Sequence, residues 1–147
     1  MTENDRPRRI VVGVDGSENA AKAARWAAQE AEERGMELHL AHALDFPTQI
    51  AMLSAIPLED VRAKAYAQGE DLVNAVRKPL AGAHPKLDIT STVSELGAAE
   101  TLVELSKTAD IVVAGSRGHG GFAGLLLGST GLAVATHAHC PAVIVRD

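Results

Sequence analysis

Almost the whole chain alternates between short apolar segments and longer segments with helical periodicity. Five segments are typical of strands and four are typical of helices. Because strands that alternate with helices form a parallel sheet with right-handed crossovers, this pattern predicts a single α/β domain with helices on both faces of the sheet. The expected strands span residues 10–14, 37–43, 87–93, 110–115 and 142–145, and the expected helices span residues 18–34, 58–78, 98–107 and 130–138.

The expected helices carry recognisable signals at their ends. Ser17 is a suitable N-cap for the first helix, and Gly35 suits the position after its last residue. Pro79 is expected to end the second helix, and Gly69 lowers the helix propensity within it. Residues 45–57 contain two prolines and no clear period, so we interpret them as a loop. The first helix also carries a stripe of small residues suited to close packing on a sheet: Ala20, Ala24, Ala27, Ala28 and Ala31.

Length and composition limit the classes of function. A chain of 147 residues suits one domain, with residues 1–8 as a flexible N-terminal tail and residues 9–147 as the folded unit. The net charge of −5 and the aromatic content of 3% argue against binding to nucleic acid. No apolar run approaches the ~18–20 residues that span a bilayer, and the polar start has no signal-peptide core. We therefore expect a cytoplasmic protein that binds neither membranes nor nucleic acid.

Cys140 is the single cysteine, which excludes an intrachain disulfide. Because it precedes Pro141 at the start of an apolar strand, we interpret it as a buried and inert residue. His137 and His139 lie nearby, but a spacing of two would place them on different faces of a helix. A histidine at the C-terminus of a helix also complements the helix dipole. We therefore expect no metal site.

A glycine-punctuated segment follows the fourth expected strand and leads into the last helix. It contains Gly115 and Gly118, and nine residues separate Gly118 from Gly128, which precedes Ser129 and Thr130. Glycines allow positive φ angles and a close approach of the backbone, and the start of a helix offers unpaired N–H groups. The two hydroxyls can add donors. This pattern favours phosphate binding, although a tight strand-to-helix loop without a ligand could use the same residues.

This pattern resembles the universal stress protein family, whose nucleotide-binding branch carries Gly, two residues, Gly, nine residues, Gly and then Ser or Thr. Residues 10–17 resemble the first strand and turn of the family, and residues 140–145 resemble its closing strand. The resemblance implies a five-stranded parallel sheet of order 3-2-1-4-5, of the adenine nucleotide alpha hydrolase-like type. Strands one and four would lie side by side where the winding reverses, which is where such sheets bind ligands.

The resemblance also implies a ligand and a partner. The ligand would be ATP or a related adenine nucleotide, with or without Mg²⁺. The partner would be a second copy of the chain, bound by antiparallel pairing of the exposed last strand. That strand comprises Ala142, Val143, Ile144 and Val145.

The expected site residues follow from the same resemblance. Val14, Ala43 and Ala114 match positions around the adenine, and Asp15 would bind the ribose. Asp15 could instead be a turn residue that bonds to its own backbone. Arg117 and His119 lie in the loop, where they could neutralise phosphates or point to solvent. The full set of nucleotide-binding residues is Val14, Asp15, Ala43, Ala114, Gly115, Arg117, Gly118, His119, Gly128, Ser129 and Thr130.

Common catalytic motifs are absent from the sequence. It contains neither the Gly-x-x-x-x-Gly-Lys-Ser/Thr loop of P-loop nucleotidases nor the Gly-x-Ser-x-Gly elbow of hydrolases. We therefore expect a stress-linked regulatory or binding protein without dedicated catalytic residues. One alternative is slow ATP hydrolysis or autophosphorylation, with Ser129 or Thr130 as acceptor and His119 as a polar helper. Another is a dimeric interaction module that binds no nucleotide.

Overall fold

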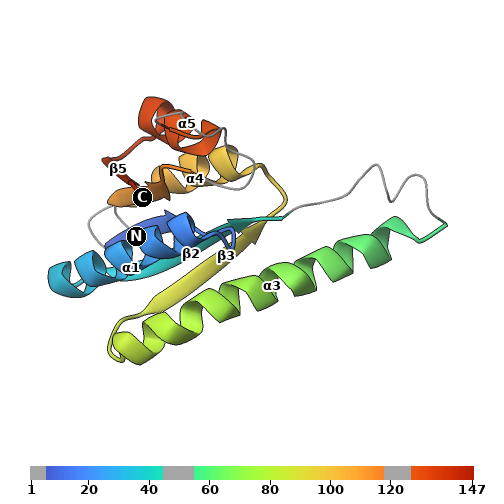
Figure 1. Cartoon of the computed structure of the whole chain (residues 1–147), viewed down its shortest axis with the longest axis horizontal. Coiled ribbons are helices and arrows are strands. Elements are labelled where there is room, and N and C mark those ends of the chain that lie inside the picture. The colour runs from blue at the N-terminus through green and yellow to red at the C-terminus, as the bar shows by residue number, and fades with distance from the viewer. Residues whose placement is uncertain (1–5, 45–54, 118–126) are drawn as a thin grey trace.

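A single parallel sheet organises the chain in the computed structural model, which describes residues 6–44, 55–117 and 127–147 (Figure 1). Its strand order is β3-β2-β1-β4-β5, and all neighbouring strands run parallel. The expected fold class and strand order are therefore confirmed. The strands are β1 (Arg9–Gly13), β2 (Glu37–Ala43), β3 (Ile89–Ser94), β4 (Ile111–Gly115) and β5 (Ala142–Val145), and the helices are α1 (Glu18–Arg34), α3 (Leu58–Ala83), α4 (Ala98–Ser106) and α5 (Ser129–His137).

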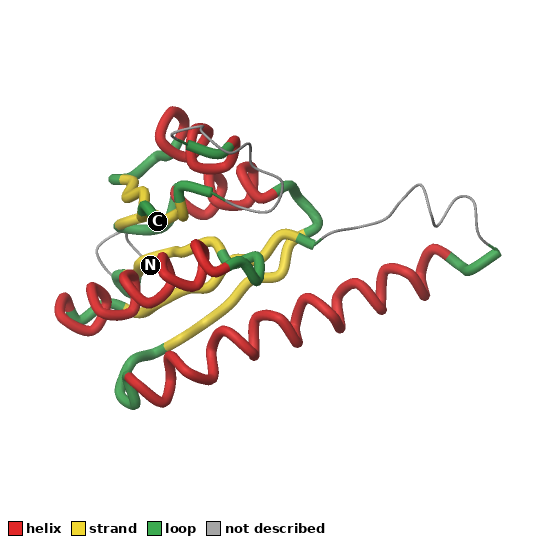
Figure 2. Tube along the Cα trace, viewed as in Figure 1, coloured by secondary structure: helices red, strands yellow, loops and turns green. Residues whose placement is uncertain are grey.

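The helices cover both faces of the sheet (Figure 2). One hydrophobic cluster joins α1 and α3 to side chains such as Val12 and Leu40, and a second joins α4 and α5 to side chains such as Val11 and Val112. Because successive strand residues point to opposite faces, β1 and β4, which are covered on both faces, are apolar at nearly every position. Among the described residues, no helix combines the length and apolar character needed to span a bilayer.

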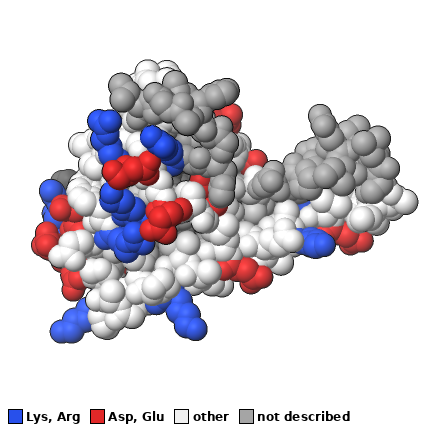
Figure 3. All heavy atoms as spheres, in the orientation of Figure 1, with Lys and Arg blue, Asp and Glu red and all other residues white. Residues whose placement is uncertain are grey.

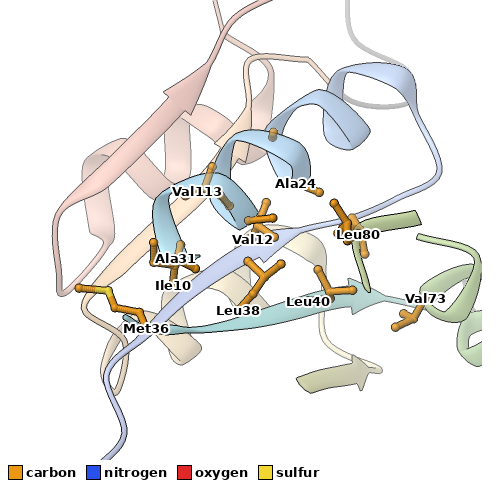
Figure 4. Packing of buried hydrophobic residues seen from close by; sticks show 14 residues of the cluster. Ile10, Val12, Ala24, Ala31, Met36, Leu38, Leu40, Val73, Leu80 and Val113 are labelled. Atoms are coloured by element: carbon orange, nitrogen blue, oxygen red, sulfur yellow. The ribbon is translucent and has the colours of Figure 1, made fainter. Parts of the chain in front are cut away.

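The alanine stripe of α1 lies directly on the sheet (Figure 4). Ala24 and Ala31 are 1% and 0% exposed and pack with Ile10 and Leu38 from β1 and β2. Side chains this small let the helix approach the strands closely. The predicted caps are also confirmed, because the Ser17 hydroxyl accepts from the Ala20 N–H and Gly35 has a φ of 66°.

Helix α3 corrects one expectation, because Pro79 does not end it. The helix continues to Ala83, and its final turn is closed by the His84 N–H, which donates to the Leu80 carbonyl at 2.8 Å. Pro79 is exposed, whereas Leu80 is 5% exposed and belongs to the main hydrophobic cluster. We attribute the continuation to the burial of Leu80, which offsets the hydrogen bond that the proline lacks. The first turns of α3 reach past the ends of the strands (Figure 1).

The loop predicted between β2 and α3 falls mostly on residues 45–54, which lie outside the described residues. The predicted tail is described only from residue 6. Arg6 Nη1 donates to the Thr108 carbonyl at 2.7 Å, and the Arg8 carbonyl accepts from the Glu37 N–H. The boundary of the tail at residue 8 therefore stays a prediction.

His39 is one of two buried histidines in β2. Its Nδ1 and Nε2 atoms lie 2.7 Å from the hydroxyls of Thr90 and Thr92 on β3. Burial, with a smaller contribution from the Arg9 charge, lowers the pKa of His39 from 6.5 to about 4. His39 is therefore neutral at pH 7 and joins β3 to β2 through two hydrogen bonds.

Candidate functional site

The carboxyl ends of β1 and β4 lie side by side, with Val11 opposite Val112 and Val12 opposite Val113. These two strands occupy the point where the winding of the sheet reverses, since the chain builds β2 and β3 on one side and β5 on the other. Open α/β sheets bind their ligands at this point. The turn after β1 and the loop after β4, identified separately in the sequence, therefore meet at one edge of the sheet.

The two ends of the glycine loop are brought together. The Gly128 N–H donates to the Ser116 carbonyl at 2.6 Å, although eleven residues separate them in the chain (residues 117–127). Gly128 is the N-cap of α5, and Ser129 and Thr130 open the helix. A glycine cap has no side chain to occupy the first N–H groups, and the first turn carries no acidic residue. This helix start can therefore accept an anion.

Gly115 and Gly128, at the two ends of this loop, do not have the positive φ angles that glycine allows. Gly128 has a φ of −71°, and the glycines with positive φ in the described ranges are Gly16 and Gly35. A Cβ at Gly115 would lie 2.6 Å from the Oδ1 atom of Asn19. A glycine is therefore required at position 115 because another side chain approaches the backbone closely, and not because of its φ angle.

Asn19 is a residue of this region that the sequence analysis missed. It is 9% exposed and lies in the first turn of α1, where its Oδ1 accepts from the Arg117 N–H at 2.6 Å. One signal in the sequence could have identified it. Asn19 precedes the buried Ala23 and Ala27 by four and eight residues, which places it on the same face of the helix as the alanine stripe.

Asp15 forms the turn that follows β1. Its Oδ1 accepts from the Ser17 N–H at 2.9 Å, which is the geometry of an Asx turn, and Gly16 between them has a φ of 84°. The turn interpretation of Asp15 therefore holds in the structure.

The three residues expected near adenine lie at the ends of three adjacent strands. Val14 and Ala114 are 4% and 3% exposed, and Ala43 is partly exposed at the end of β2. The Val14 N–H donates to the Ala41 carbonyl, and the Val14 carbonyl lies 2.8 Å from His42 Nδ1. The backbone of Val14 is therefore already bonded within the sheet.

The structure describes some of the remaining predicted site residues and not others. Arg117 pairs through Nε with an Asp147 carboxylate oxygen at 3.2 Å, and both side chains are about half exposed. Ser129 is exposed and Thr130 is partly buried. Gly118 and His119 lie outside the described residues. In the described ranges, no group of three or more His, Cys, Asp or Glu side chains could hold a metal ion.

Comparisons with a family model, with curated proteins and with solved structures all point to the same family. The model of the universal stress protein family matches residues 7–146. A universal stress protein of Mycobacterium tuberculosis is 35% identical over 151 residues, which cover 100% of this chain and 50% of the relative. The chain thus spans about half the length of the mycobacterial relatives that it matches.

Two solved structures are similar over nearly the whole chain. A universal stress protein in complex with cAMP has a TM-score of 0.67 and 29% identity, covering 95% of this chain and 96% of that one. UspA from Lactobacillus plantarum has a TM-score of 0.78 and 22% identity, covering 97% and 100%, and is similar in fold. The chain belongs to the universal stress protein family.

Proposed function

We propose that this protein binds ATP or a related adenine nucleotide at the carboxyl edge of β1 and β4, and that it acts as a stress-linked regulatory or binding protein. The observation that carries the proposal is the hydrogen bond that joins the two ends of the loop between β4 and α5. The bond between Gly128 and Ser116 sets the uncapped start of α5 beside the end of β4. The similar structure at 29% identity contains cAMP, which supports an adenine nucleotide as the class of ligand.

The phosphates would lie at the start of α5. The first N–H groups of that helix, with the hydroxyls of Ser129 and Thr130, would donate to them. Gly115 and Gly118 would allow the backbone of the loop to approach the phosphates, while Arg117 and His119 would add positive charge or donors. On the face shown in Figure 3, basic and acidic side chains lie interspersed, and the chain carries a net charge of −5. The binding of an anion would therefore depend on these local donors.

The base and sugar would lie toward β1 and β2. Val14, Ala43 and Ala114 would lie around the adenine, and the Asp15 carboxylate would bind the ribose hydroxyls. Mg²⁺ would enter with the triphosphate, since this ion is typically held by phosphate oxygens, water and one or two carboxylates.

The direct test is to identify the small molecule that leaves the purified protein on denaturation. We expect mass spectrometry to find ATP or another adenine nucleotide. Where the purified protein is empty, calorimetric titrations with ATP, AMP and cAMP would rank the ligands. Failure of all three to bind would contradict the proposal and favour the interaction module.

We further propose that β5 joins two copies of the chain. It is an edge strand with no neighbour beyond it among the described residues. Its outer N–H and C=O groups can pair with an identical strand, and antiparallel pairing would give a closed two-fold dimer.

The cytoplasmic location expected from the sequence stays a prediction.

A further inference from the structure

Asn19 is a buried amide on the alanine-rich face of α1. Its Oδ1 accepts from the Arg117 N–H at 2.6 Å, and its Nδ2 donates to the Val145 carbonyl at 3.3 Å. A backbone N–H needs an acceptor and a backbone carbonyl needs a donor, so the two partners fix the orientation of the amide. One side chain of α1 thus connects the loop after β4 with the last residue of β5.

The contacts of Asn19 belong to a larger hydrogen-bonded group. The Val145 carbonyl also accepts from the Ser116 N–H at 2.8 Å, and the Ser116 carbonyl accepts from the Gly128 N–H. Gly115 has no side chain, which leaves the space that the Asn19 amide occupies. The start of the loop, the end of β5 and the cap of α5 are therefore held in one arrangement around this amide.

Asn19 does not form the cap of its own helix. The Ser17 hydroxyl serves that purpose by accepting from the Ala20 N–H at 3.2 Å. Both described hydrogen bonds of the Asn19 side chain instead reach residues about one hundred positions or more away in the chain. Its role is therefore between elements and not within α1.

We propose that Asn19 is a positioning residue that holds the start of the loop after β4 (residues 116–117), through the Arg117 N–H, beside the start of α5 in the arrangement that receives the phosphates. This inference rests on the proposed function for its ligand. Ala at position 19 would lose both hydrogen bonds. Asp would keep the acceptor for Arg117 but would turn a carboxylate oxygen toward the Val145 carbonyl.

The Asn19→Asp variant distinguishes a role that bridges the loop and β5 from a role confined to α1. A carboxylate in the first turn of a helix interacts favourably with the helix dipole, but at the buried position 19 the cost of desolvating the charge opposes this gain. The ATP affinity therefore separates the two roles, and a role confined to α1 predicts the affinity of the wild type. A bridging role predicts a lower melting temperature and ATP binding weakened by roughly tenfold, because the part-buried Val145 carbonyl loses one of its two donors and faces a carboxylate oxygen. Asn74→Asp is the matched control, since Asn74 is exposed on α3 and pairs only with Arg77 in the described ranges.

The decisive experiment is a double-mutant cycle of Gly115→Ala and Asn19→Ala, read as melting temperature without nucleotide and then as ATP affinity. A Cβ at position 115 would meet the Asn19 amide at 2.6 Å, so Gly115→Ala should destabilise the wild type strongly. It should have little further effect once position 19 is Ala. If Gly115→Ala alone fails to fold, restoration of folding in the double variant would support the same conclusion.

Additive losses in this cycle would overturn the inference, as would Asn19→Ala with the ATP affinity of the wild type. Wild-type protein that binds no adenine nucleotide would instead contradict the proposed function. The stability cycle requires no ligand, so the two failures are distinguishable.

Discussion

At the scale of single residues, Asp15 has to satisfy a turn and, by our proposal, a ribose. Asp15→Ala removes both interactions, and we expect ATP binding to weaken by roughly ten- to hundredfold, since a hydrogen bond to a charged group contributes on the order of 1.5–3 kcal/mol. Asp15→Asn keeps the acceptor for the Ser17 N–H but removes the charge. Calorimetric titration of both variants with ATP would check this. Wild-type affinity in Asp15→Ala would leave the turn as the residue's only role.

His39 makes stability depend on pH in a defined window. The unfolded chain takes up a proton at His39 near pH 6.5, whereas the folded protein does so only near its pKa of about 4. The contribution of His39 to the unfolding free energy should therefore not change with pH above 6.5, and it should fall as the pH decreases from 6.5 to 4. The loss from this group is on the order of 3 kcal/mol, because the folded and unfolded pKa values differ by about 2.5 and a difference of one corresponds to about 1.4 kcal/mol.

Urea unfolding at several pH values would measure this effect, with His39→Gln as the comparison. The variant has no titrating group at this position and should show a shallower slope across the window. Equal slopes in the two proteins would show that other groups cause the acid sensitivity.

At the scale of the elements, Gly69 is a point of close contact between α3 and the side chains of Leu44, which follows β2, and Val93 of β3. A Cβ there would lie 2.5 Å from Leu44 Cδ2 and 3.1 Å from Val93 Cγ1, whereas nothing lies within 4 Å of a Cβ at Gly82 in the same helix. Gly82→Ala should stabilise the protein by about 0.5–1 kcal/mol through helix propensity. Gly69→Ala should gain less or destabilise, because its methyl group overpacks the contact. Equal changes in thermal unfolding would exclude this close contact.

The elements also show what the sequence could predict. Periodicity identified every described helix and strand, because apolar strands and the alanine stripe of α1 reflect burial directly. The continuation of α3 past Pro79 was missed, since it depends on the burial of Leu80 against residues distant in the chain. Asn19 was missed for a related reason. Its partners, Arg117 and Val145, lie about one hundred positions or more away, and no local pattern contains them.

The candidate site was predictable only in part. The described motif residues lie at one edge of the sheet, as expected, because parallel strands bring their carboxyl ends together; that this edge binds a ligand stays a prediction. The reason for glycine at position 115 was not predictable, since it is a contact with another element and not a local conformation. The ion pair between Arg117 and Asp147 was likewise not predictable, because it depends on the position of the chain after β5 relative to the loop.

At the scale of the whole molecule, the proposed dimer can be tested at the exposed start of β5. Ala142→Lys adds a charge to the free edge, where lysine opposes strand pairing, and it replaces an exposed side chain. We expect a monomer at micromolar concentration in sedimentation experiments. Ala81→Lys is the control, because it makes the same change at an exposed position of α3 and should leave the dimer intact. A dimer that persists in Ala142→Lys, or a monomeric wild type, would contradict the proposed interface.

The central claim is that the start of α5 binds the phosphates of an adenine nucleotide. Gly128 has φ −71° and ψ 171°, a conformation that valine also adopts, so Gly128→Val fills ligand space without straining the backbone. The most direct measurement is the melting temperature of wild type and Gly128→Val with and without ATP. We expect ATP to stabilise the wild type, by about 2.7 kcal/mol at one hundred times the dissociation constant, and to leave the folded variant unchanged. An equal ATP-dependent shift in both proteins, or none in the wild type, would contradict the claim.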